Sequence, residues 1–269
     1  MRLSKAIMIV TILACALPLA QAGVITYGLV GYWTGNGTAD DSSATANNGT
    51  FSGSYGAGTN GQALAFNTGT GQVYVPNNPA YAVGSDFSVG FWFDYANSPY
   101  TSSLVADDNG PGLTQKWLIN YQGDFLITLC DGATANFLTS SSVVLPAGWN
   151  QFTLVDDGGT WTFYLNGGSI GSAAQYGPPL SPVPTAPLTI GGSSGDGYPG
   201  FDGLMQDVVI YDRALSGSEV GELAQTGSAT PEPTSLAMLG SGLLMVVGSA
   251  LRRARRGVSA RLRRGKTAL

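Results

Sequence analysis

Short apolar runs separated by turn-forming residues constrain the fold of this chain more than any other feature. The sequence has 269 residues, 39 of them glycine, and its aromatic and β-branched residues gather between clusters of Gly, Asn, Asp and Ser. Such runs are typical of β-strands, and the central part of the chain shows no helical period. The sequence predicts strands at Leu29–Trp33, Ala63–Asn67, Gln72–Val75, Phe87–Tyr95, Lys116–Tyr121, Phe125–Cys130, Trp149–Asp156, Trp161–Leu165, Leu188–Gly191 and Met205–Tyr211.

The connections between these runs indicate an antiparallel arrangement. Asn166-Gly167 supplies the positive-φ pair of a type I′ hairpin, whereas the proline-rich stretch Gly177–Pro187 is expected to be loop. Many strands joined by hairpins, without crossover helices, predict an all-β, two-sheet antiparallel jelly-roll sandwich. One helix is expected, at Ser216–Ala224, because Ser216 and Glu219 have the spacing of a capping box.

The charge between Gly23 and Thr230 is strongly one-sided. This region holds 16 Asp and Glu residues but only two cationic side chains, Lys116 and Arg213. Such a surface disfavours nucleic acid and anionic lipid, and it suits divalent cations. Cys130 is the only cysteine of the region, so sheet packing rather than an intrachain disulfide must stabilise it.

The residues that usually carry catalysis are scarce. The chain has no histidine, and its only glutamates are Glu219, Glu222 and Glu232. Glycoside hydrolysis by two aspartates is the remaining enzymatic alternative, since it needs only a pair of carboxyl groups on either side of the cleaved bond. The adjacent pairs Asp107-Asp108 and Asp156-Asp157 are expected in solvated loops. The sequence therefore predicts a protein that is not an enzyme, with no catalytic residue.

Ten motifs follow one another through the middle of the chain. They are Gly28–Trp33, Asp40–Ser43, Asn47–Thr50, Gly61–Phe66, Tyr74–Pro76, Asp86–Phe93, Pro146–Phe152, Phe163–Gly167, Leu188–Gly192 and Phe201–Ser216. Their order and spacing resemble those of bacterial laminin-G-like domains, which have the concanavalin A-like jelly-roll fold. The resemblance implies one such domain over residues 23–230. The sequence departs from the family pattern after Trp149, where Asn150 and Gln151 stand in place of a frequent histidine.

The N-terminal segment has the features of a secretory signal peptide. Basic residues near the start are followed by an apolar run and then by Ala20-Gln21-Ala22. We expect residues 1–22 to be removed before Gly23. A lipoprotein signal cut before Cys15 is the alternative.

The C-terminal segment joins a Pro-Glu-Pro motif, an apolar run and a cluster of arginines. The sixteen residues of this apolar run, 236–251, would span about 24 Å as a helix, and the arginines should stay in the cytoplasm. The segment resembles a PEP-CTERM sorting signal over residues 231–256, followed by a basic cytoplasmic extension, 257–269. The resemblance implies an exosortase-type protease as partner, a transient inner-membrane anchor, and release to the surface of a Gram-negative bacterium; a plain anchor is the alternative. Its residues are Pro231, Glu232, Pro233, Arg252, Arg253, Arg255 and Arg256.

One aspartate is expected among apolar neighbours. Strand alternation places Asp207 on the face of Met205, Val209 and Tyr211, where an unpaired carboxylate is costly. The laminin-G resemblance implies that an aspartate at this place helps to bind a structural calcium ion. Calcium takes six to eight oxygen ligands, and the side chains expected to join Asp207 are Asp40, Asp41 and Asn47. The alternative is that Asp207 pairs with Arg213 or faces water, while Asp40-Asp41 stabilises a turn.

Aromatic side chains are the candidates for a ligand-binding face, because they stack well on the C–H faces of sugars. The candidates are Trp117, Trp161, Tyr121 and Tyr198. The leading hypothesis is an exported, non-catalytic module of the cell surface or extracellular matrix that recognises exopolysaccharide or another glycan. The alternatives are a structural or protein-binding module without a sugar site and, third, a glycoside hydrolase.

Overall fold

The computed structural model describes residues 24–67, 71–82, 84, 86–96, 101–178, 180–193 and 200–226, all within one compact unit, Val24–Ala229. The predicted signal peptide (1–22), sorting signal (231–256) and basic extension (257–269) lie outside these residues. Within them, no helix is both long enough and apolar enough to cross a membrane.

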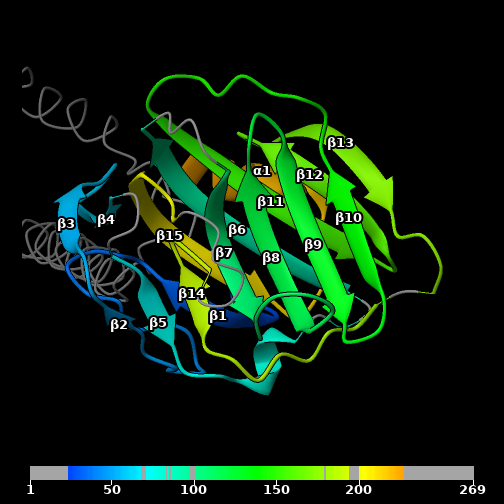
Figure 1. Ribbon diagram of the computed structural model, residues 1–269. Coiled ribbons are helices and arrows are strands. Elements are labelled where there is room, and N and C mark those ends of the chain that lie inside the picture. Colours follow the sequence, from blue (N-terminus) through cyan, green and yellow to red (C-terminus); the bar gives the residue numbers. More distant parts are fainter. Residues whose placement is uncertain are drawn as a thin grey trace, which may run out of the picture. The chain divides into compact units, whose positions relative to one another are not determined.

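Two antiparallel sheets form a sandwich (Figure 1). The strands of the larger, eight-stranded sheet are β1 (Leu29–Trp33), β3 (Ser54–Ala57), β4 (Gln62–Phe66), β6 (Asp86–Tyr95), β11 (Trp149–Asp157), β12 (Thr160–Leu165), β13 (Gly168–Ala174) and β15 (Gly203–Tyr211). Those of the seven-stranded sheet are β2 (Thr50–Phe51), β5 (Val73–Val75), β7 (Ser102–Asp108), β8 (Gln115–Tyr121), β9 (Phe125–Asp131), β10 (Ala135–Thr139) and β14 (Leu188–Ile190). A 3-10 turn, η1 (Pro79–Tyr81), and one helix, α1 (Gly217–Thr226), complete the elements.

Within each sheet, some neighbouring strands are consecutive in the sequence and others are far apart in it. The larger sheet runs β13-β12-β11-β6-β15-β4-β3, with β1 also paired to β15, and the smaller sheet runs β10-β9-β8-β7-β14-β5-β2. In Figure 1 the seven-stranded sheet faces the viewer, and the larger sheet lies behind it. The jelly-roll sandwich expected from the sequence is confirmed.

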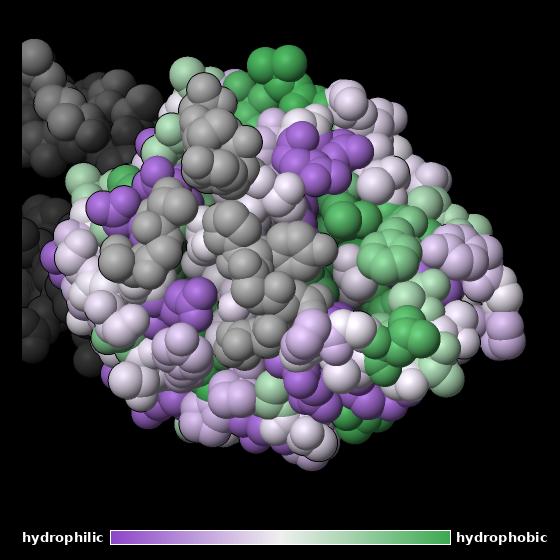
Figure 2. Space-filling model, viewed as in Figure 1, coloured by the Kyte–Doolittle hydropathy of each residue, from purple (hydrophilic) through white to green (hydrophobic). Residues whose placement is uncertain are grey.

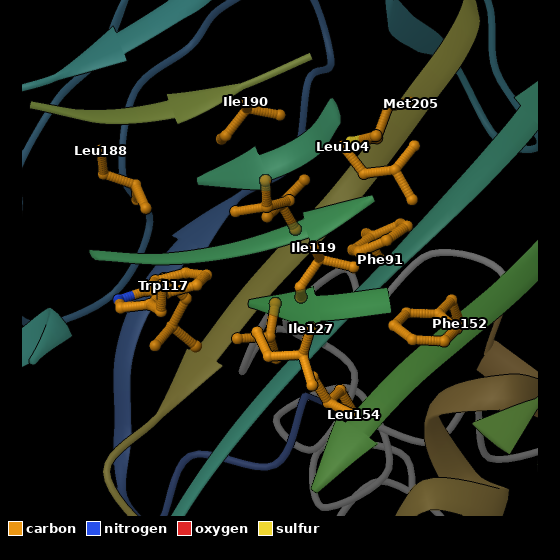
Figure 3. Close-up of a cluster of buried hydrophobic side chains, with 14 of the residues drawn as sticks. Phe91, Leu104, Trp117, Ile119, Ile127, Phe152, Leu154, Leu188, Ile190 and Met205 are labelled. Atoms are coloured by element: carbon orange, nitrogen blue, oxygen red, sulfur yellow. The ribbon is translucent and has the colours of Figure 1, made fainter. Parts of the chain in front are cut away.

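The core lies between the two sheets (Figure 3). Alternate residues of each strand point inward, as the two-residue period of a strand requires. In β8 and β9 the inward set includes Trp117, Ile119 and Ile127, which meet Phe91 and Phe152 of the opposite sheet. Phe125 of β9 stacks on Phe152 with ring centroids 4.0 Å apart, so aromatic packing joins the two layers.

A second apolar cluster lies on the outer face of the larger sheet, beneath α1. Val220 and Leu223 of the helix pack there with Tyr32, Val155 and Tyr211 of the sheet. The predicted capping box is confirmed: the Ser216 amide donates to Glu219 Oε2 (2.8 Å), and the Glu219 amide donates to Ser216 Oγ (3.3 Å). The helix thus begins where its first free amides find side-chain acceptors.

A β-bulge interrupts β15 where the strand changes partner. Its first residues pair with β4 and its last with β1, and the register shifts between Gln206 and Val209. Asp207 takes a positive φ of 52° at this point. The bulge puts Met205 in the main core but Val209 and Tyr211 in the outer cluster. The expectation that all three share one face with Asp207 is wrong for Met205, whereas Asp207 contacts Tyr32 of the outer cluster that holds Val209 and Tyr211.

Candidate ligand-binding pocket

Two of the four predicted ligand-binding residues have no exposed face. Trp117 and Trp161 are both fully buried in the main core, and the Trp117 indole donates to the Tyr81 carbonyl (2.9 Å). Neither indole can therefore stack on a sugar in this structure. Strand alternation places each tryptophan on one of the two faces of its sheet. The sequence alone does not show which of these faces the opposite sheet covers. Tyr198 lies outside the described residues.

The third candidate, Tyr121, lines a pocket at one end of the sandwich. Its volume is about 660 Å³. Tyr95 comes from the end of β6, Tyr121 from the end of β8, and Gly123 from the β8–β9 turn, while the segment 142–148 before β11 supplies the rest of the wall. The pocket therefore combines both sheets with one loop.

Aromatic contacts fix the floor of this pocket. Tyr95 and Tyr121 meet edge to face, with centroids 5.2 Å apart, and Tyr95 also stacks on Phe201 at 6.0 Å. Tyr121 contacts Phe125 at 4.9 Å, which ties the pocket to the core. The two tyrosines are thus held in place before any ligand binds.

Hydrogen bonds hold the loop wall against this floor. The Tyr121 hydroxyl donates to the Val143 carbonyl (3.0 Å), and the Val143 amide donates to the Gly123 carbonyl (2.9 Å). Burial raises the pKa of Tyr121, with smaller contributions from Tyr95 and Asp124, so the phenol stays neutral and keeps its donor. The sequence analysis did not identify Tyr95 or the loop 142–148 as part of a site. Tyr95 ends a predicted strand, and the loop runs into the next predicted strand, so neither carried a recognisable binding motif.

The lining of the pocket is aromatic and polar. Its lining residues are Tyr95, Tyr121, Gly123, Ser142, Val143, Val144, Leu145, Pro146, Ala147 and Gly148. No carboxylate or cation is among them. Phenol rings, a serine hydroxyl and main-chain groups can hold an uncharged polar molecule, but they supply no acid–base pair.

Two of the predicted calcium ligands, Asp41 and Asn47, are hydrogen-bonded within the protein. Asp41 Oδ1 accepts from the amides of Tyr32 (2.9 Å) and Ser43 (2.8 Å), and Oδ2 accepts from the Asn47 amide (2.9 Å). The Asn47 side chain donates to the Pro76 carbonyl (2.6 Å), while Asp40 is exposed. The alternative in which Asp41 stabilises a turn is what the structure shows.

Asp207 is held by neutral donors beside the bulge. Its Oδ1 accepts from the Tyr32 hydroxyl (3.0 Å) and its Oδ2 from the Gln206 side-chain amide (2.8 Å). Burial raises the pKa of Asp207 to about 6, although both hydrogen bonds lower it. Arg213, the alternative partner, pairs with Glu219 instead.

These contacts do not bring the four residues together as a metal site. Among the described residues, no group of three or more His, Cys, Asp or Glu side chains could hold a metal ion. Calcium binding stays a prediction from the resemblance.

The expectation that the two aspartate pairs lie in solvated loops is wrong for three of the four residues: both pairs lie in strands, β7 and β11, and of the four residues only Asp157 is exposed. Asp107, Asp108 and Asp156 are 1–2% exposed. Burial, with the neighbouring Asp108 charge, raises the pKa of Asp107 to about 7, and burial raises that of Asp156 to about 6. Asp107 lies in the smaller sheet and Asp156 in the larger, and neither lines a described pocket.

Comparison with known proteins places the fold in a family. A laminin-G family model, described as the concanavalin A-like lectin/glucanases superfamily, matches residues 67–221, more than half of the chain. No curated protein matches the chain.

Three solved structures illustrate the likeness. Domain 4 of AbnA, a GH43 extracellular arabinanase from Geobacillus stearothermophilus solved in complex with arabinotriose, has a TM-score of 0.60 at 21% identity and covers 75% of this chain and 100% of that one. The binding domain of Paraclostridial Mosquitocidal Protein 1 has a TM-score of 0.57 at 18% identity, with 74% and 52% covered. A botulinum neurotoxin type C structure, from work on cell entry through two ganglioside molecules, has a TM-score of 0.55 at 14% identity, with 75% and 51% covered. This chain thus spans about half of the two toxin structures.

At these identities the solved structures show a shared fold, and the family rests on the sequence match. The chain belongs to the concanavalin A-like lectin/glucanases superfamily.

Proposed function

We propose that this protein is an exported, non-catalytic module that binds a glycan in the pocket of Tyr95 and Tyr121. The pocket carries the proposal: its volume of about 660 Å³ lies in the range of small-molecule sites, and its walls combine aromatic rings with hydroxyl and main-chain groups. Aromatic faces bury the C–H surface of a sugar, and the polar groups can pair with its hydroxyls. The likeness to an arabinanase domain solved with arabinotriose supports a glycan ligand.

The placement of the carboxylates supports binding rather than hydrolysis. A glycosidase needs two carboxyl groups about 5–9.5 Å apart across the cleaved bond. No Asp or Glu lines either of the two hollows described. The buried Asp107 and Asp156 point away from solvent, where no substrate could reach them.

A protein-binding role is the second candidate, and one surface feature favours it. Figure 2 shows apolar side chains gathered over the β9–β10 region of the seven-stranded sheet. Leu113 and Phe137, 56% and 58% exposed, line a hollow of about 360 Å³ there. Exposed apolar patches of this kind occur at protein interfaces.

The binding proposal is tested by filling the pocket. Ala147 is exposed on the pocket wall, so Ala147→Trp should occupy the pocket without disturbing the core. The control is Ala133→Trp, an equally exposed alanine in the β9–β10 turn. Calorimetric titration with arabino-oligosaccharides and with the host's exopolysaccharide should give micromolar to millimolar binding, roughly 4–8 kcal/mol.

Ala147→Trp should weaken that binding at least about tenfold, and Ala133→Trp should leave it unchanged. If both variants lost the same amount of glycan affinity, the binding site could not be assigned to this pocket. A folded wild-type protein that binds no glycan would leave the protein-binding candidate.

Export and sorting are proposed from the two terminal segments, which lie outside the described residues. We expect the mature protein to begin at Gly23, and the tail to be cut near Pro231-Glu232-Pro233 by an exosortase-type protease. Mass spectrometry of the protein recovered from the cell surface tests both ends. Deleting residues 231–233 should leave the tail uncut and the protein in the inner membrane. A wild-type protein that keeps its tail intact and stays in the inner membrane would instead indicate a plain anchor.

A further inference from the structure

The domain has almost no positive charge to offer a ligand. Between Gly23 and Thr230 the sequence contains 16 acidic residues and two cationic side chains, Lys116 and Arg213. A carboxylate, sulfate or phosphate that leaves water needs a cation or several strong donors to replace its hydration. Whether either cation is free decides which ligands the domain can hold.

Lys116 is committed inside the fold. It is 2% exposed, and its Nζ lies 3.4 Å from Asp108 Oδ1 and donates to the Gly110 carbonyl. Asp108 is itself held by the Gly110 amide (2.9 Å) and the Ser193 hydroxyl (2.6 Å). Removing Lys116 from this arrangement would leave a buried carboxylate without its counter-charge, so the ammonium cannot turn to a ligand.

Arg213 is committed on the outer face of the larger sheet. Its guanidinium makes a two-point contact with Glu219, at 2.6 and 3.0 Å, and its Nε donates to the Tyr27 carbonyl (2.8 Å). The same group lies 5.0 Å from the ring centroid of Tyr27 and 5.7 Å from that of Tyr211. These contacts fix it beside α1, and it does not line the pocket.

One negative charge acts on the pocket. Asp124 follows the lining residue Gly123, and its charge adds to the effect of burial on the pKa of Tyr121. A negative charge beside the pocket opposes the entry of an anion.

We infer that the pocket selects glycans that carry no carboxylate, sulfate or phosphate group, so that its ligand is a neutral sugar chain rather than an acidic one. This inference rests on the proposed function, because it names the ligand class of the same pocket. Phenol rings, Ser142 and the main chain of 143–148 can pair with sugar hydroxyls, and both cationic side chains of the described residues, Lys116 and Arg213, are already engaged.

Matched sugars that differ only at C6 test the selectivity. The purified protein is titrated with oligosaccharides of galactose, mannose and glucose, and with the corresponding galacturonate, mannuronate and glucuronate chains, at low and high NaCl. At least one neutral chain should bind about tenfold or more tightly than its uronate partner. Its affinity should change little with salt, since no ion pair is formed.

A uronate bound as tightly as its neutral partner, with an affinity that falls in salt, would overturn the inference while leaving glycan binding intact. Failure to bind any chain, neutral or acidic, would instead overturn the proposed function itself, and the selectivity with it. The two failures are therefore distinguishable in one set of titrations.

Adding a positive charge to the pocket tests whether missing positive charge causes the selectivity for neutral sugars. Ser142 is exposed on the pocket wall, so Ser142→Lys supplies the charge that the pocket lacks. This variant should bind the uronate chain several-fold more tightly than wild type, in a salt-sensitive way. Ala133→Lys, outside the pocket, is the matched control and should show no gain. Equal uronate binding by Ser142→Lys and wild type would contradict the assignment of selectivity to missing positive charge.

Discussion

At the scale of single residues, Asp41 stabilises the loop after β1 through three backbone amides. Replacing it with alanine removes both acceptor oxygens and the three hydrogen bonds they accept, one of them from the amide of the buried Tyr32. Hydrogen bonds to a charged group contribute about 1.5–3 kcal/mol each, but the loop can relax. We expect Asp41→Ala to lower the free energy of unfolding by about 3 kcal/mol, measured by urea titration.

The neighbouring Asp40 is the control for this change and also tests calcium. Asp40 is exposed, so Asp40→Asn should change the free energy of unfolding by less than about 0.5 kcal/mol. Both variants are compared with wild type in calcium and in chelator. If Asp40, Asp41, Asn47 and Asp207 hold calcium, wild type will be more stable with the ion, and Asp40→Asn will lose part of that gain.

Part of the candidate pocket could be predicted at this scale and part could not. Tyr121 was chosen because tyrosines bind sugars, and it does line the pocket. Trp117 and Trp161 were chosen on the same ground, yet both face the core. Residue type does not show which sheet face is covered. That depends on the opposite sheet, whose strands lie more than 20 residues away in sequence.

At the scale of elements, helix α1 is held by Glu219. This side chain accepts from the Ser216 amide and pairs with Arg213, and these contacts lower its pKa to about 2. Glu219→Gln loses the ion pair, so we expect the free energy of unfolding to fall by about 1 kcal/mol at pH 7. Glu222→Gln, an exposed glutamate of the same helix, should have almost no effect. Thermal unfolding of both variants checks the difference, and equal losses would indicate a general charge effect.

Strands and turns that are marked by their own residues could be predicted from the sequence. Features that arise from pairing with a distant strand could not. All ten predicted strands are present with bounds within two residues, and Asn166 and Gly167 have the positive φ values of their hairpin, 51° and 80°. Five strands were missed: β2, β3, β7, β10 and β13. Of these, β3 and β13 are rich in small residues and lie at sheet edges. The bulge at Gln206-Asp207 was missed because it arises where β15 changes from β4 to β1, which no local pattern records.

At the scale of the whole molecule, buried aspartates make stability depend on pH. The pKa values of Asp107, Asp156 and Asp207 rise from 3.8 to about 7, 6 and 6, mainly through burial. The folded state therefore binds these protons more tightly than the unfolded state. This contribution is fully present below pH 3.8 and is lost progressively as the pH rises from 3.8 through 6 to 7. Glu219, whose pKa is lowered to about 2, contributes stability that is lost as the pH falls below 4.5. The three aspartates outweigh the single glutamate, so we expect stability to be highest at about pH 4 or slightly below and to fall steadily above it.

Asp107 should account for the largest part of the loss above pH 5, because its pKa is raised furthest and its Oδ1 has no hydrogen-bond partner. Asp107→Asn keeps the shape of the side chain but removes the proton that titrates. Wild type should lose roughly 5 °C or more in Tm between pH 5 and pH 8, and the variant should lose clearly less. Asp131→Asn is the control, because hydrogen bonds from the amides of Thr134 and Ala133 lower the pKa of Asp131 and confine its effect to acid. A Tm that rises from pH 5 to pH 8 in wild type would mean that these aspartates are ionised in the folded state, with their burial offset by a bound cation.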